Sequence, residues 1–177
     1  MVEPTVHGVD LSRFVGVPYD IRRHTESVPV EEFIENPELG SNCQLLVVGM
    51  LKLCGFNIDT PNTVGRIGSK ELWLYVGDEV LLVDRNDSSG YVDYFIRGKR
   101  AFDIFFFWPP GMQFTESIDD FKRLHVGIFL PVDCDKKVPI LHNYKGGESG
   151  FWECEEFYRK DYKLFGVKRP IKGGENL

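Results

Sequence analysis

One cysteine stands where a thiol nucleophile is chemically most useful. Cys43 follows the small and polar residues Gly40, Ser41 and Asn42 and opens an apolar stretch over 43–54, whose length favours a buried helix. At the N-terminus of a helix, unpaired N–H groups and the helix dipole favour the thiolate, and the same groups can hold an oxyanion. Cys43 is therefore the candidate nucleophile. The alternative is an inert, small buried residue, which is the fate of most free cysteines.

A cysteine nucleophile needs a base, and two of the four histidines stand at the ends of predicted strands. His125 opens the apolar run 125–130, and His142 closes the run 138–142. A hairpin joining these strands would bring both imidazoles to one end of a sheet. One imidazole could then accept the thiol proton while the other fixes its orientation. The alternative for either histidine is a hydrogen-bonded strand residue without a catalytic role.

Cysteine and histidine are also zinc ligands, so a metal site has to be considered. The order His125, Cys134, His142, Cys154 has gaps of 9, 8 and 12 residues and lacks the close ligand pairs of structural zinc sites. The sequence also has no phosphate-binding glycine loop and no Gly-x-Ser-x-Gly elbow. We therefore expect neither a metal nor a cofactor.

The elements that must position these residues change character along the chain. A short helix is predicted over 29–36 and a buried helix over 43–54, with a helical turn over 117–124 whose Ser117 and Asp120 are spaced like a capping box. Strands are predicted over 79–84, 91–96, 101–108, 125–130, 138–144 and 165–169. Because helices come first and strands later, we expect an α+β fold in which the early buried helix packs against a mostly antiparallel sheet.

Composition and charge narrow the function classes. The 177 residues, 42% hydrophobic and 27% charged, predict one domain over 1–177, with a core at about 10–170 and a flexible tail over 171–177. The 21 basic against 27 acidic residues give a net charge of -6, which argues against a nucleic-acid partner. The apolar runs over 45–51 and 104–108 are too short to span a bilayer, and the first residues do not resemble an export signal. We therefore expect a cytoplasmic protein without membrane insertion, whose four cysteines are reduced.

Six short motifs occur in an order that resembles a known family. They are Val15-Gly16-Val17-Pro18-Tyr19, Asn42-Cys43-Gln44-Leu45, Ala101-Phe102-Asp103-Ile104-Phe105-Phe106, Leu124-His125-Val126-Gly127-Ile128-Phe129-Leu130, Ile140-Leu141-His142 and Val167-Lys168-Arg169. Over about residues 10–170 the chain resembles the NlpC-type cysteine peptidases, a papain-like superfamily best known for cutting peptidoglycan stem peptides. The segment after Cys43 resembles the catalytic helix, and that around His125 the strand of the catalytic base.

The resemblance implies a papain-like fold and a role for each matching residue. Cys43 would be the nucleophile, His125 the general base and acid, His142 the orienting third member, and Tyr19 a wall of the substrate site. Asn42 replaces the family's acidic residue, which resembles a clamp for a free substrate amine, and the bulkier Gln44 replaces a small serine. We therefore expect Tyr19, Asn42 and Gln44 to line a substrate site that has lost an ionic anchor. The insert 131–137 lengthens the hairpin between the two histidines.

Two hypotheses follow for the function. The first is a thiol-dependent hydrolase that cleaves an amide or peptide bond through an acyl-enzyme, in a peptidoglycan-type or other small peptide substrate. The second is a non-catalytic, papain-like binding module in which Cys43 is inert.

Overall fold

The structure is a computed structural model that describes residues 5–6, 8–23, 28–58, 67–83, 92–112, 117–132 and 134–173. His7 and His24 lie outside the described residues. The described helices and strands form an α+β fold, as expected from the sequence. No helix within the described ranges combines the length and the apolar composition needed to cross a membrane.

The first part of the described chain is mainly helical. Its elements are strands β1 (Thr5–Val6) and β2 (Val9–Asp10), 3-10 helices η1 (Ser12–Phe14) and η2 (Pro37–Leu39), and helices α1 (Val30–Glu35), α2 (Cys43–Leu53) and α3 (Ser69–Tyr75). Acidic Glu31 and Glu32 occupy the first turn of α1, where they complement the helix dipole, and Pro37 follows its end. The helices predicted over 29–36 and 43–54 are thus confirmed.

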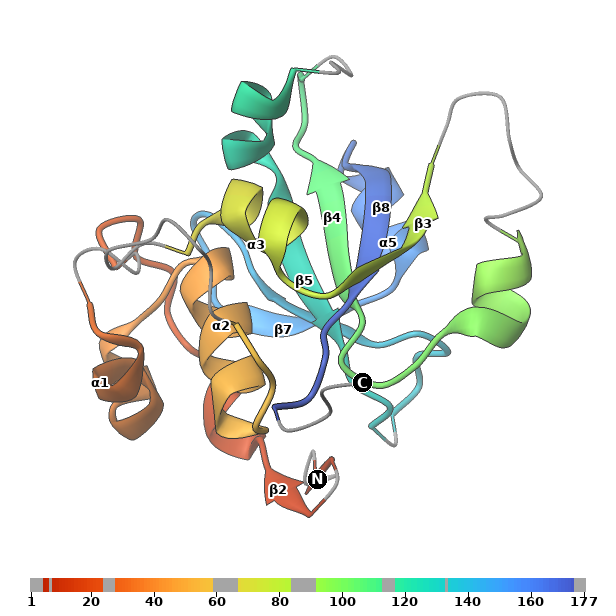
Figure 1. Ribbon diagram of the computed structural model, residues 1–177. Coiled ribbons are helices and arrows are strands. Elements are labelled where there is room, and N and C mark those ends of the chain that lie inside the picture. Colours follow the sequence, from red (N-terminus) through yellow and green to blue (C-terminus); the bar gives the residue numbers. More distant parts are fainter. Residues whose placement is uncertain are drawn as a thin grey trace.

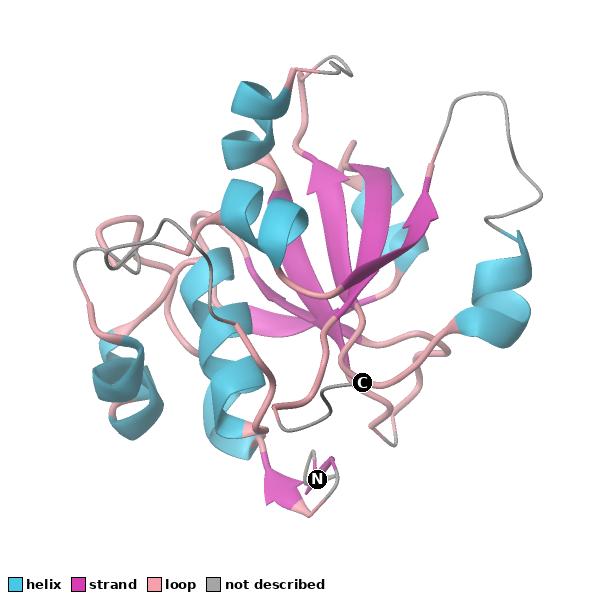
Figure 2. Ribbon diagram, viewed as in Figure 1, coloured by secondary structure: helices cyan, strands magenta, loops and turns pink. Residues whose placement is uncertain are grey.

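Six strands make one antiparallel sheet, which is magenta in Figure 2. They are β3 (Asp78–Leu82), β4 (Ile104–Trp108), β5 (His125–Phe129), β6 (Ile140–Asn143), β7 (Ser149–Trp152) and β8 (Lys163–Arg169), in the spatial order β3-β8-β4-β5-β6-β7. Helix η3 (Tyr94–Gly98) precedes β4, η4 (Ile118–Arg123) precedes β5, and α5 (Cys154–Arg159) precedes β8. The expected mostly antiparallel sheet is confirmed.

The core lies on both faces of the sheet. Strand β4 is buried along its whole length: Phe106 and Trp108 pack in the cluster that contains α2 and α3, whereas Phe105 and Phe107 pack in the cluster that contains Phe157 of α5. Figure 1 shows α2 and α3 over one face of the strands and α5 on the other. Because α2 is apolar on nearly every side, it can only be stable between such a sheet and the other N-terminal elements.

The structure contradicts the strand predicted over 91–96. Tyr91 lies outside the described residues, but 92–98 are helical. The side chains at alternate positions of this run do not share a buried face, since Val92 and Ile96 are exposed. Tyr94 instead is buried and donates a hydrogen bond from its hydroxyl to Asp103, 2.7 Å away, so a tertiary anchor overrides the local β propensity.

Two other local expectations concern ends of elements. Helix η4 forms, but no side-chain hydrogen bond caps it at Ser117, so the predicted capping box is absent there. At the start of the predicted tail, Ile171 accepts a hydrogen bond from the Asn57 N–H at 2.8 Å, and Gly173 donates one to Gly55 at 3.0 Å. These backbone bonds fix the tail to the segment after α2. Residues 174–177 lie outside the described ranges.

Candidate active site

Cys43 is the first residue of α2, and the helix start is fixed by the residue before it. Asn42 has extended backbone angles, and its side-chain oxygen accepts a hydrogen bond from the Leu45 N–H at 2.9 Å. This N-cap ends the preceding turn and satisfies one of the N–H groups that the first helical turn leaves unpaired. Asn42 therefore acts as a cap in the structure, and the N–H groups of Cys43 and Gln44 remain at the helix end beside the thiol.

Two opposing effects act on the thiol of Cys43. The backbone N–H groups of Val126, Cys43 and Gln44 favour the thiolate, in the direction expected from the helix N-terminus. Burial is the larger effect, because the residue is only 7% exposed, and it raises the pKa of Cys43 to about 11. The net effect is thus opposite to the one that the sequence suggests, and the thiol is neutral at neutral pH.

The two histidines predicted to meet do meet. Nε2 of His125 lies 2.9 Å from Nδ1 of His142, and the rings are nearly perpendicular at 88°. The antiparallel register of β5 and β6 pairs Gly127 with His142. A Cβ at Gly127 would stand 2.5 Å from Ile140 Cγ2 and 3.2 Å from His142 Cβ, so only glycine leaves room for the two strands to bring these rings together.

An aromatic environment holds this histidine pair in its neutral form. The rings of Trp152, Phe157 and Tyr144 lie 4.2, 4.6 and 5.7 Å from the His142 ring, between centroids. Burial lowers the pKa of His125 to about 3, and burial together with the charge of His125 lowers the pKa of His142 to about 2. Because Nε2 of His125 is hydrogen-bonded to His142, Nδ1 of His125 is the nitrogen that can accept a proton from another group.

A cavity of about 740 Å³ brings together the residues that the sequence singles out. Cys43, His125, Tyr19, Asn42 and Gln44 all line it, whereas His142 lies behind His125 and outside the lining. The hydrogen bond of the His125 ring is made to His142, and within the described part of the chain none joins that ring to the Cys43 thiol. The sulfur instead faces the backbone N–H of Val126, the residue after His125.

Tyr162 also lines this cavity and was missed by the sequence analysis. Its ring lies 5.2 Å from the His125 ring, between centroids. Burial and then the charge of a Cys43 thiolate raise the pKa of Tyr162, and the same two causes come first for Tyr19. Both phenols therefore stand close to the sulfur and remain protonated at neutral pH. No motif surrounds Tyr162, which precedes β8, so the sequence offers no signal for it.

Gln44 links helix α2, which begins at Cys43, to the residue before His125. Its side-chain amide donates a hydrogen bond to the Ser69 hydroxyl at 2.8 Å, and this hydroxyl donates to the Leu124 carbonyl at 2.5 Å. Leu124 immediately precedes His125. The Gln44 side chain is thus engaged in a polar bridge that joins α2, α3 and the residue before β5, and this bridge ties the segment of Cys43 to that of His125.

Asn143, the residue after His142, holds the turn before Cys43 from the inside. It is fully buried, and its amide nitrogen lies 3.2 Å from the Ser41 carbonyl, 3.0 Å from the Ser41 hydroxyl and 3.2 Å from the Val17 carbonyl. A parallel bridge pairs Tyr19 with Ser41. One side chain on β6 therefore fixes both the segment of Tyr19 and the approach to Cys43. A second polar residue directly after His142 in a predicted strand was the only sequence signal for it.

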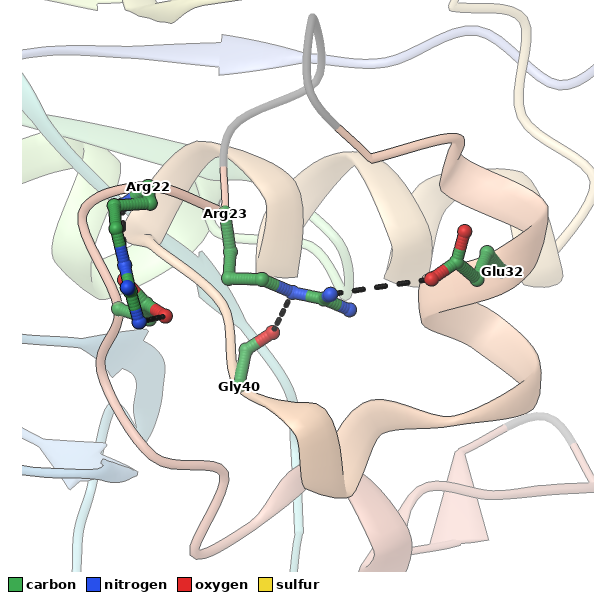
Figure 3. A network of polar contacts seen from close by, with 5 residues as sticks. Arg22, Arg23, Glu32 and Gly40 are labelled. Atoms are coloured by element: carbon green, nitrogen blue, oxygen red, sulfur yellow. Dashed lines mark hydrogen bonds and ion pairs between the residues drawn. The ribbon is translucent and has the colours of Figure 1, made fainter.

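Arg23 holds the same turn from the outside (Figure 3). Its Nε donates to the Gly40 carbonyl at 3.2 Å, and one terminal nitrogen lies 3.9 Å from a carboxylate oxygen of Glu32 on α1. The neighbouring Arg22 forms a surface ion pair with Asp20 at 2.9 Å. The turn that leads into Cys43 is thus fastened to both α1 and β6.

No family model matches the sequence, and a search of curated proteins finds no match either. All four cysteines are free thiols, and of these Cys43 alone lines the cavity described above. Within the described ranges, no three His, Cys, Asp or Glu side chains are grouped as a metal ion would require. What can be inferred about function therefore depends on the geometry of the cavity.

Proposed function

We propose that this protein is a thiol-dependent hydrolase of amide bonds, with Cys43 as the nucleophile, His125 as the general base and acid, and His142 as the residue that orients His125. The observation that carries the proposal is the shared cavity: Cys43 and His125 line the same space, and the second nitrogen of His125 is bonded to His142. A nucleophile, a base and a group that orients the base are the minimum set for this chemistry.

The reaction follows from which nitrogen is free. In the tautomer in which His125 donates its Nε2–H to Nδ1 of His142, Nδ1 of His125 takes the thiol proton while the sulfur bonds to the substrate carbonyl carbon. Nδ1 then gives this proton to the amide nitrogen, the C–N bond breaks, and the amine leaves behind a thioester on Cys43. A water molecule attacks the thioester and gives one proton to Nδ1. The S–C bond then breaks, and the proton passes to the sulfur as the acid is released.

The oxyanion of each tetrahedral intermediate needs donors beside the sulfur. Because Asn42 caps the Leu45 N–H, the N–H groups of Cys43 and Gln44 stay available at the end of α2. These N–H groups already act on the sulfur, and the oxyanion, which forms on the carbon bonded to that sulfur, would lie within their reach. Helix α2 therefore supplies the nucleophile and stabilises the charge that develops.

Burial of both groups determines the protonation state at rest. A thiol whose pKa is raised to about 11 and an imidazole whose pKa is lowered to about 3 are both neutral at pH 7. In this proposal the proton moves as the sulfur attacks, rather than beforehand. For these two described residues, the structure shows no hydrogen bond between the Cys43 thiol and the His125 ring, and in such pairs the catalytic hydrogen bond often tightens only when substrate binds.

The proposal includes a papain-like arrangement of the NlpC type. It is supported by the order of the elements: a helix that begins at the cysteine, followed by an antiparallel sheet whose adjacent strands β5 and β6 carry the two histidines.

A non-catalytic binding module is the second candidate, and the burial of Cys43 favours it. A neutral thiol that is 7% exposed behaves as a small hydrophobic side chain unless a substrate or a base activates it. In that case the cavity would bind a peptide or an amide without turnover.

Acyl transfer from an activated ester separates the two candidates. The protein is incubated with p-nitrophenyl acetate, and the acetylated residue is located by mass spectrometry while nitrophenol release is followed. We expect an acetyl thioester at Cys43, repeated turnover in the parent and in the matched control Cys134→Ser, and strongly reduced turnover in His125→Gln. Acetylation confined to the exposed Cys134, or turnover equal in the parent and His125→Gln, would overturn the proposal.

A further inference from the structure

The cavity wall carries a charge opposite to that of the whole chain. Its charged residues are the four cations Lys70, Lys122, Arg123 and Lys145 and the two anions Glu71 and Asp119. The wall thus has two more positive than negative side chains, whereas the chain as a whole has a net charge of -6. A local excess of cations around a concave site in an acidic protein raises the local concentration of anions.

Both anions of the wall are already engaged. A carboxylate oxygen of Asp119 lies 2.8 Å from Lys70 Nζ, and Glu71 accepts a hydrogen bond from the Gly68 N–H at 2.9 Å. These contacts tie α3 to η4 and cap the start of α3. Of the four cations, only Lys70 is paired within the wall. Lys122, Arg123 and Lys145 are all exposed, and none of them forms an ion pair with another described residue.

The three cations belong to the segments that flank the strands of the two histidines. Lys122 and Arg123 end helix η4, just before His125, and Lys145 lies two residues beyond the end of β6. The cap Asn42, which also lines the cavity, is uncharged and stands where the resembled family has an acidic residue for a substrate amine. The site thus lacks the negative charge that would attract an amine, and its wall has more positive than negative side chains.

We propose that Lys122, Arg123 and Lys145 bind an anionic group of the substrate, a carboxylate or another oxyanion, next to the amide bond that Cys43 attacks. This inference rests on the proposed function and names the class of amide that the site accepts. Lysine supplies a point charge and arginine a two-pronged donor for such a group. An acidic peptide, or the amide of a dicarboxylic acid, has the required charge.

Alkylating reagents of similar size and different charge test this inference without a known substrate. The rates at which iodoacetate and iodoacetamide modify Cys43 are measured by mass spectrometry at low ionic strength, and each is divided by the rate for N-acetylcysteine. We expect the anionic reagent to be favoured at Cys43. A cation on the order of 10 Å from the reagent in water changes the rate of alkylation by iodoacetate by about twofold. The rate of Cys43 alkylation by iodoacetate should therefore fall about eightfold in the variant Lys122→Gln/Arg123→Gln/Lys145→Gln, and the rate with iodoacetamide should hardly change.

The matched control removes the same charge elsewhere. Arg97, Arg100 and Lys160 are exposed and lie outside the cavity wall, so their triple change to glutamine should leave the ratio of the two rates within about twofold of the parent. High salt should abolish the preference in the parent. Protection of Cys43 by glutarate would assign a carboxylate, and protection by inorganic phosphate a phosphate group.

The two proposals fail in different ways. If Cys43 reacts with iodoacetamide in a manner that depends on His125, but both triple variants show the same ratio of rates as the parent, only the anionic-substrate inference is overturned. If neither reagent modifies Cys43, or if modification is unaffected by His125→Gln, the proposed function falls and this inference falls with it.

Discussion

A methyl group added at Gly127 should break the arrangement of the two histidines. The new Cβ would stand 2.5 Å from Ile140 Cγ2 and 3.1 Å from the Leu141 carbonyl oxygen, and 3.2 Å from His142 Cβ. The first of these distances is more than 1 Å below carbon–carbon contact at about 3.5–4.0 Å, so β5 and β6 must separate. Overpacking of this kind costs about 1–3 kcal/mol, which lowers the melting temperature of a chain of this size by about 2–12 °C.

The neighbouring strand supplies a matched control. Gly150 of β7 pairs with the same residue, His142, from the other side, and a Cβ there meets nothing within 4 Å. Gly150→Ala should therefore leave stability unchanged or raise it by up to about 1 kcal/mol, because alanine restricts the unfolded chain.

Both variants are compared by thermal unfolding and by the rate of Cys43 alkylation at neutral pH. Gly127→Ala should melt earlier and alkylate more slowly, since separated strands pull His142 away from its 2.9 Å contact with His125. Equal melting temperatures for the two variants would refute the packing argument. A destabilised Gly127→Ala protein that keeps the parent's alkylation rate would refute the role assigned to the histidine pair.

Two further predictions concern buried polar groups in and behind the cavity wall. The pKa of His125 is lowered from 6.5 to about 3, and that of His142 from 6.5 to about 2. Below pH 6.5 the unfolded chain therefore binds more protons than the folded chain. The free energy of unfolding should be at its full value above pH 6.5 and should fall as the pH drops towards 3. His142→Gln should give a shallower pH dependence in urea unfolding, and an unchanged slope would contradict the burial argument. Asn143→Asp keeps the shape but removes the donors to Ser41 and Val17, which should cost about 1–3 kcal/mol in the same assay. The control is Asn36→Asp, at a half-buried position whose side chain makes one 3.4 Å hydrogen bond; its free energy of unfolding should stay within about 0.5 kcal/mol of the parent. Equal losses of stability in the two variants would contradict the structural role assigned to Asn143.

The sequence was informative where one local pattern determines the outcome. The apolar stretch from Cys43 has a cap, sufficient length and a glycine stop, so α2 could be located nearly to the residue. The segments of His125 and His142 carry strong apolar runs and are consecutive predicted strands, so a hairpin was the simplest arrangement, and in the structure it brings the two imidazoles together. These elements also carry the residues on which the proposed function rests.

The sequence was uninformative where tertiary contacts decide. The run 91–96 has β-type composition, yet the buried Tyr94 and its bond to Asp103 make it helical. Asn143 and Tyr162 belong to no motif, and only the folded chain places them beside the turn of Ser41 and the ring of His125. The sign of the Cys43 pKa shift was also out of reach, because the depth of burial that outweighs the helix N-terminus is a property of the packed structure.

The most direct test of the central claim is the pH dependence of Cys43 alkylation by iodoacetamide in the parent and in His125→Gln. If His125 takes the thiol proton during attack, the parent at pH 7 should react at least about tenfold faster than the variant, since general base catalysis contributes about 10²–10⁴-fold in favourable cases. The two profiles should converge as the pH approaches 11, where the thiol ionises without help. Superimposable profiles from pH 6 to pH 11 would show that the imidazole does not act on the thiol, and Cys43 would then be a packed, inert side chain.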